Sequence, residues 1–232
     1  MTFFSTAKST GILVIAGICL VLAFSLASTS YAKDKDDLPE VSSDGLHLVK
    51  DSKVRVAYAK PGASLAKYRK LILLDCYVQF KEDWKHEYNL NEVGLSGRVS
   101  DADLEEMKTK MAAEFKKVFT KELETEGGYE IVGITGPDVL ILRPAIINLD
   151  PTAPALDSNS AFHRTIVRSA GQMTLFLEFY DSENKELLAR VIDPRADQFG
   201  GEADKFHNRV AADRILRHWA DLLRDYLDEV TK

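Results

Sequence analysis

The sequence has few of the residues that build metal sites and disulfide frameworks. Its 232 residues include two cysteines, Cys19 and Cys76, and five histidines. No pair of histidines has the spacing of a metal-binding motif such as His-Glu-x-x-His, and Cys76 has no neighbouring cysteine. His207 and His218 are separated by about 16 Å on a helix, too far to share one metal ion. The sequence therefore predicts no metal site and no cofactor.

Catalytic loops and clusters of positive charge are also missing. There is no Gly-x-Ser-x-Gly turn of a serine hydrolase and no glycine-rich phosphate loop, so no catalytic residue is predicted. Among residues 1–32 only Lys8 is charged, so the rest of the chain carries 29 of the 30 Lys and Arg against 36 Asp and Glu, a net charge of −7. A mildly acidic chain with mixed charges argues against nucleic acid and anionic membranes as partners.

One long apolar run is present, but it is too short for a typical membrane span. It extends from Gly11 to Leu26, whereas a spanning helix needs about 20 apolar residues. Lys8 precedes it, and small residues lead to Ala32, where signal peptidase would find Ser30 and Ala32 in its two small pockets. We therefore predict that residues 1–32 are a signal peptide, cleaved after Ala32, and that the protein is periplasmic.

Two alternatives for this segment are a retained membrane anchor and a lipoprotein. Gly17 and Ser25 interrupt the apolar run, and the cleavage-like site follows it, which favours cleavage over a stable anchor. Lipid attachment would require a small residue before Cys19, where the sequence has Ile18.

After cleavage Cys76 is the remaining cysteine, so no intramolecular disulfide can form. Residues 33–45 are charged and predict a solvated leader, and residues 46–232 predict a single domain. Cys76 lies in an apolar strand over residues 70–80. Alternation along that strand places five residues on one face, with Cys76 as a small core residue: Ile72, Leu74, Cys76, Val78 and Phe80.

The remaining periodicity predicts an α+β fold. Apolar residues at helical spacing follow Ser100 up to Gly127, and a second such stripe, with Trp219, covers residues 204–230. Residues 172–180 and 187–193 predict a hairpin. Pro144 indicates that the strand over residues 139–149 is at an edge or carries a bulge. We expect a mainly antiparallel sheet with two amphipathic helices packed on one face, a two-layer sandwich.

Two places are weak candidates for a binding site. Trp84 lies in a predicted loop over residues 81–99, where an exposed indole would indicate a recognition surface and a buried one would anchor the loop. Asp193 and Arg195, with Asp197, lie in a predicted loop at the end of a strand. They could bind a polar ligand, or pair with one another and fix the loop's shape.

Several segments together resemble a bacterial family known as domain of unknown function family 3313. The resemblance covers about residues 46–230 and implies the same fold and an exported protein, but no catalytic residue. Many members look like lipoproteins, and this sequence lacks their lipid-attachment cysteine. The matching segments are 68–75, 136–145, 178–182 and 187–190, followed by the helix with Trp219.

These observations favour a non-enzymatic binding or envelope-assembly module whose partner is another envelope protein. One alternative is a periplasmic hydrolase with an unrecognised site, built from Asp193, Arg195 and His163, which would have to converge in one cleft. Another is a carrier of a small ligand or lipid, which would need an apolar cavity between the sheet and the helices. The sequence leaves the oligomeric state open.

Overall fold

The computed structural model describes seven stretches of the chain: residues 37–92, 97–126, 128–152, 165–167, 171–196, 201–203 and 205–231. The chain divides into two units, Met1–Lys33 and Asp34–Lys232, and every described residue belongs to the second. The predicted signal peptide and the first residues of the predicted leader lie outside the described residues. In the described part, no helix is both long and apolar enough to cross a membrane.

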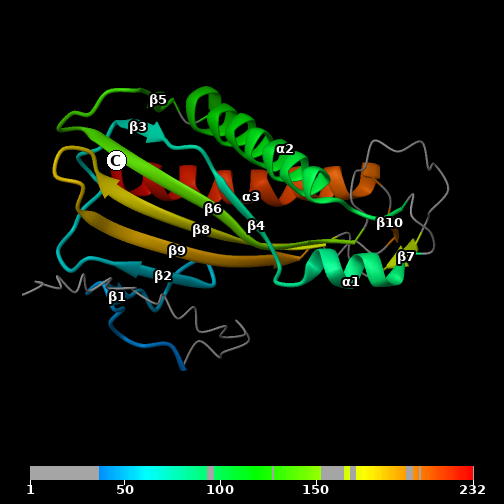
Figure 1. The fold of residues 1–232 in the computed structure, drawn as a ribbon. Coiled ribbons are helices and arrows are strands. Elements are labelled where there is room, and N and C mark those ends of the chain that lie inside the picture. Colours follow the sequence, from blue (N-terminus) through cyan, green and yellow to red (C-terminus); the bar gives the residue numbers. More distant parts are fainter. Residues whose placement is uncertain are drawn as a thin grey trace, which may run out of the picture. The chain divides into compact units, whose positions relative to one another are not determined.

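Helices and strands alternate irregularly along the chain (Figure 1). Their bounds are β1 His47–Leu48, β2 Val56–Ala59, β3 Lys70–Leu73, β4 Tyr77–Phe80, α1 Trp84–Asn91, α2 Asp101–Thr120, the π-helix η2 Lys121–Glu126, β5 Glu130–Ile131, β6 Val139–Pro151, β7 Thr165–Val167, β8 Gly171–Asp181, β9 Leu187–Ala196, β10 Gly201–Ala203 and α3 Lys205–Thr231.

The main sheet is mixed, and the prediction of a mainly antiparallel sheet is wrong. Its order is β1-β2-β9-β8-β6-β3-β5, with β4 also paired to β6, and β7 pairs with β10 separately. Strands β1, β2, β9, β8 and β6 pair antiparallel, whereas β3, β4 and β5 make parallel pairs. The parallel pairs arise because the chain passes through α1 and α2 between β4 and β6, and such a crossover returns it in the same direction.

Both long helices and the hairpin are confirmed, but the described chain has a third α-helix. Ser100 caps α2 in a capping box with Asp103, as the sequence indicates, and η2 extends the helix to Glu126. Helix α1 forms where a loop was expected. Its single buried residue is Trp84, so it has no repeating apolar stripe by which the sequence could reveal it.

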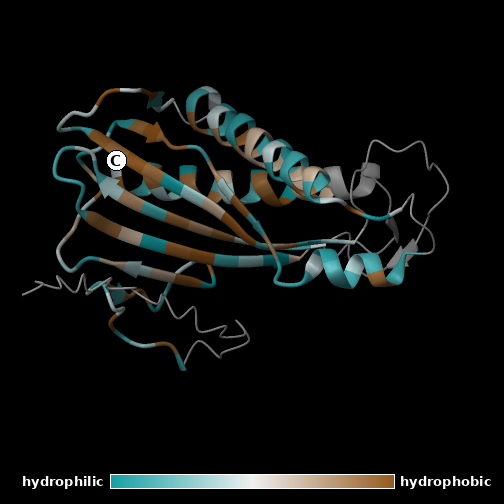
Figure 2. Ribbon diagram, viewed as in Figure 1, coloured by the Kyte–Doolittle hydropathy of each residue, from teal (hydrophilic) through white to brown (hydrophobic). Residues whose placement is uncertain are grey.

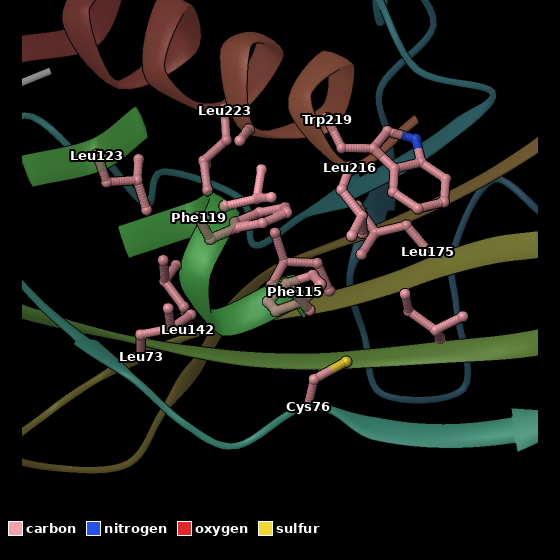
Figure 3. Close-up of a cluster of buried hydrophobic side chains, with 14 of the residues drawn as sticks. Leu73, Cys76, Phe115, Phe119, Leu123, Leu142, Leu175, Leu216, Trp219 and Leu223 are labelled. Carbon is pink, nitrogen blue, oxygen red and sulfur yellow. The ribbon is translucent and has the colours of Figure 1, made fainter. Parts of the chain in front are cut away.

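The core lies between one face of the sheet and the helices α2 and α3. Phe115 and Phe119 of α2 are fully buried, and their rings stack 3.9 Å apart. Figure 3 shows side chains from η2 and α3 meeting them from one side and side chains of β3, β6 and β8 from the other. This packing accounts for the two-layer arrangement. The labelled members are Leu73, Cys76, Phe115, Phe119, Leu123, Leu142, Leu175, Leu216, Trp219 and Leu223.

The opposite side of the sheet, called the outer face below, is covered in part by the segment that precedes β2. Leu46 is buried there against Val56 and Tyr58, and Leu38 packs on the same small cluster. The Tyr58 hydroxyl donates to Pro39 O at 2.9 Å. Residues 38–48, called the strap below, therefore pack on β2 and β9, although most of their side chains before Leu46 are exposed.

Pro144 lies in the interior of the sheet, so of the two predicted alternatives the edge position is wrong. The other alternative, a bulge in this strand, is matched by a shift in the β6–β8 register between Ile147 and Asp150. Strand β6 pairs with β8 on one side and with β3 and β4 on the other. Leu74 donates its N–H to Leu142 O at 3.0 Å, and the next β6 amide facing that neighbour belongs to Pro144, which has no N–H. The chain leaves the ladder there and pairs again only from Tyr77. The missing donor is accommodated by the break between β3 and β4.

This break shifts the alternation of buried side chains by one residue. Leu71 and Leu73 are buried before it, and Cys76 and Val78 after it, whereas Leu74 is 41% exposed. The prediction that Ile72 and Leu74 share a face with Cys76 is therefore wrong, because it assumed an unbroken strand. The core position predicted for Cys76 is confirmed.

We expect Cys76 to resist thiol reagents in the native protein. Burial raises the pKa of this thiol from 9.0 to about 12, although a hydrogen bond from the Ile146 backbone opposes the change. Because folding raises the pKa of Cys76, the neutral thiol contributes its full share of folding stability below pH 9. This contribution is lost as the pH rises towards 12.

The measurement is the rate of thiol modification in the chain without residues 1–32, in which Cys76 is the only cysteine. Modification should be slow in buffer at about pH 8.5, where an exposed thiol is partly ionised, and fast in concentrated urea. Equal rates under the two conditions would show that Cys76 is accessible.

Candidate functional site

Asp193, one of the predicted site residues, is a buried junction between three parts of the fold. Its Oδ1 accepts the Arg55 backbone N–H at 2.7 Å, just before β2. Its Oδ2 accepts Trp219 Nε1–H of α3 at 2.8 Å and Arg195 Nε–H at 2.7 Å. These donors occupy most of the acceptor sites of a carboxylate. The arrangement joins β9, α3 and the start of β2, and it leaves little of Asp193 for a ligand.

The predicted loop around Asp193 is a strand instead. The ladder between β8 and β9 continues through Met173 opposite Arg195 and ends only at Ala196. Arg195 is half-buried and lies beside Asp193, so the structure brings these two candidates together. Asp197 and His163 lie outside the described residues. The convergence required by the hydrolase hypothesis is therefore seen for Asp193 and Arg195 alone.

Trp84, the other candidate, is buried at the start of α1. Its indole lies between Phe80, with ring centroids 4.7 Å apart, and Tyr88, at 5.4 Å. Its Nε1–H donates to Pro151 O at 3.2 Å. This geometry fastens α1 to β4 and to the end of β6, which matches the anchoring alternative.

Asp181 is a further buried carboxylate with structural partners. Its side chain accepts hydrogen bonds from Lys67 Nζ at 2.8 Å, the Tyr68 hydroxyl at 2.7 Å and the backbone N–H of Glu183 and Asn184. The bond from Lys67 is the main cause that holds the pKa of Asp181 well below its usual range. Burial raises the pKa of Tyr68 to about 12, with a contribution from Asp181. This cluster fixes the turn between β8 and β9.

An apolar row crosses the outer face of the sheet, and it was not among the predicted sites. The pairing register aligns one residue from each of five neighbouring strands, as seen for the strands in Figure 1. The strap covers one end of the row, where Val56 is buried, and at the other end Tyr77 is 62% exposed. The row consists of Tyr77, Ala145, Phe176, Ile192 and Val56.

A charged row runs beside the apolar row. Arg143, Glu178 and Arg190 are paired across β6, β8 and β9. Arg190 binds Glu178 Oε1 through Nε at 3.0 Å and Nη2 at 2.7 Å, and its guanidinium lies 5.4 Å from the centre of the Phe176 ring. Figure 2 shows hydrophobic and hydrophilic residues following one another along these strands. The outer face thus offers apolar and charged groups side by side.

The sequence could not reveal these rows because their residues come from strands that are distant in the chain. The break between β3 and β4 determines which residues of β4 face outward. The pairing register of the strands determines which residues lie side by side. Alternation in β8, with Phe176 and Glu178 on one side and Leu175 and Leu177 on the other, was the available signal.

A family model described as "Protein of unknown function (DUF3313)" matches residues 41–223. No curated protein matches the chain. Among solved structures, a PelC dodecamer from Paraburkholderia phytofirmans is similar at 12% identity with a TM-score of 0.36, covering 72% of this chain and 96% of that chain. A homolog of a neuraminyllactose-binding hemagglutinin from Helicobacter pylori is similar at 10% identity with a TM-score of 0.35, covering 74% and 94%. Similarity this low establishes neither a shared fold nor a shared function.

We expect Asp193→Ala to lower the free energy of unfolding by about 3–5 kcal/mol, because it leaves buried donors and the Arg195 charge without their acceptor. The measurement is urea denaturation followed by circular dichroism. Lys108→Ala, on the helix α2, is the control and should change stability by less than about 0.5 kcal/mol. Unchanged stability in Asp193→Ala would show that the carboxylate is not a structural junction.

Proposed function

The chain belongs to the DUF3313 family, whose function is unknown, and we propose that it is an exported, non-enzymatic binding module of the cell envelope. In this proposal its partner is another envelope protein, which docks on the outer face of the sheet. The signal peptide predicted for residues 1–32 supports export to the periplasm.

The observation that supports docking is the exposure of the apolar row over β4, β6 and β8. Tyr77 is 62% exposed, and Ala145 and Phe176 beside it are only partly buried. Tyrosine and phenylalanine are enriched at protein interfaces, where they bury a large area with few rotatable bonds. The other face of the sheet is already covered by α2 and α3, so the outer face is the side that a partner can reach.

The hydrogen bonds of the buried carboxylates indicate that these groups have a structural role. Asp193, Glu178 and Asp181 are each bonded to at least two donors that belong to the fold itself. These bonds account for the burial of the three carboxylates without a catalytic role. The side chains that fill the space between helices and sheet likewise favour a packed core over the cavity of a carrier (Figure 3).

Site-specific cross-linking in living cells tests this proposal. A photo-reactive phenylalanine analogue replaces Tyr77 in the full chain, and the control replaces Tyr226 of α3, which is 46% exposed. We expect the analogue at position 77, but not at position 226, to form one discrete adduct with another envelope protein.

A second substitution separates specific docking from chance contact. Ala145→Asp, beside Tyr77, places a charge in the apolar row and should abolish the adduct, while circular dichroism confirms that the variant is folded. Adducts of equal yield at positions 77 and 226, or an adduct that survives Ala145→Asp in folded protein, would contradict docking on this face.

A further inference from the structure

The strap shows how part of the outer face already holds an acidic segment. Leu46 is 2% exposed and packs in one cluster with Val56 and Tyr58. Two residues earlier, Asp44 forms an ion pair with Arg190. Gly45 between them has φ of 79°, a left-handed conformation that suits glycine. The strap thus combines one carboxylate on an arginine with one leucine on the apolar row.

The second arginine of the charged row lies on the part of the face that the strap leaves open. Arg190 has a side chain 17% exposed, between Asp44 and Glu178, whereas the side chain of Arg143 is 63% exposed. Both arginines approach Glu178, which lies between them on β8.

Arg143 is the less well paired of the two. Glu178 Oε1 receives both bonds from Arg190, and Oε2 accepts the Tyr180 hydroxyl at 2.8 Å. The ion pair of Arg143 with Oε2 is longer, at 3.5 Å, and its Nη1–H donates to the Tyr180 hydroxyl at 3.4 Å. No other ion pair of Arg143 is seen within the described stretches. A charged group that is exposed and held at this distance can bind a further carboxylate at little cost in desolvation.

Apolar contacts lie next to Arg143, as they do next to Arg190. Ala145 follows Arg143 by one outward-facing position on β6, and its neighbours in the apolar row are Tyr77 and Phe176. The open part therefore repeats the combination that the strap uses: an arginine beside an apolar surface.

We propose that the open part of the outer face binds a segment of a partner protein in which an acidic residue lies close to a leucine-like residue. Arg143 binds the carboxylate, and the apolar row from Tyr77 to Phe176 binds the apolar side chain. This inference rests on the proposed function and names the chemistry of the partner.

The test uses a synthetic peptide with the sequence of residues 37–50, labelled for fluorescence anisotropy, as the probe. It is titrated with the chain without residues 1–32, whose strap remains in place. We expect saturable binding, weakened about tenfold by Arg143→Gln and by a comparable factor when the peptide carries Asp44→Asn. The two changes together should weaken binding little more than either alone, because each removes the same ion pair.

Arg214→Gln on α3, the matched control on an exposed arginine, should leave the affinity unchanged. Absence of peptide binding would overturn the inference. An affinity that does not depend on Arg143 would also overturn it, and would be the result expected if the peptide displaced the strap at Arg190. The cross-linking at position 77 is independent of this charge pair. An adduct there without charge-dependent peptide binding would leave the proposed function standing and remove only this inference.

Discussion

A single missing backbone donor, that of Pro144, lies opposite the break that sets which side chains strand β4 presents on each face of the sheet. Strand β6 is an interior strand with neighbours on both sides, and at Pro144 it cannot donate to the strand beside it. That neighbour divides into β3 and β4, and the shift by one residue places Cys76, Val78 and Phe80 in the core. The same shift turns Tyr77 outward, into line with Ala145 and Phe176. The place of Tyr77 in the apolar row therefore depends on the break opposite Pro144.

The two faces of the sheet have different roles. The inner face is covered by α2 and α3, and the buried Asp193 ties this layer to the edge of the sheet through Trp219 and the Arg55 backbone. On the outer face the polar groups are paired less completely, and their exposure increases from Arg190, beside the strap, to Arg143. Rigid packing on one side allows the other to present a fixed pattern of apolar and charged groups, which is what recognition of a partner requires.

Local patterns in the sequence predicted those elements whose side chains repeat along one segment. The helical stripes gave α2 and α3, the capping residue Ser100 marked where α2 begins, and alternation gave the hairpin of β8 and β9. Elements and sites that depend on pairing between distant segments could not be predicted in this way. Pro144 predicts an edge strand or a bulge, because a missing N–H is most easily tolerated there. The strand is instead interior, and the break between β3 and β4, which cannot be seen in the sequence, accommodates the missing donor. Asp193 lies in β9 rather than in a loop because the pairing of β9 with β8, also invisible in the sequence, continues to Ala196.

We propose that a partner covers the outer face in the cell. This coverage can be measured by comparing cysteine labelling in intact cells with labelling of the purified protein, using a thiol reagent that enters the periplasm. Gln79→Cys reports on the outer face beside Tyr77, and Thr109→Cys reports on the exposed side of α2, while the native Cys76 is buried and stays silent. If a partner covers the outer face, labelling at position 79 is several-fold slower in cells than in the purified protein, with no such difference at position 109. Equal labelling at position 79 in both settings would contradict this proposal.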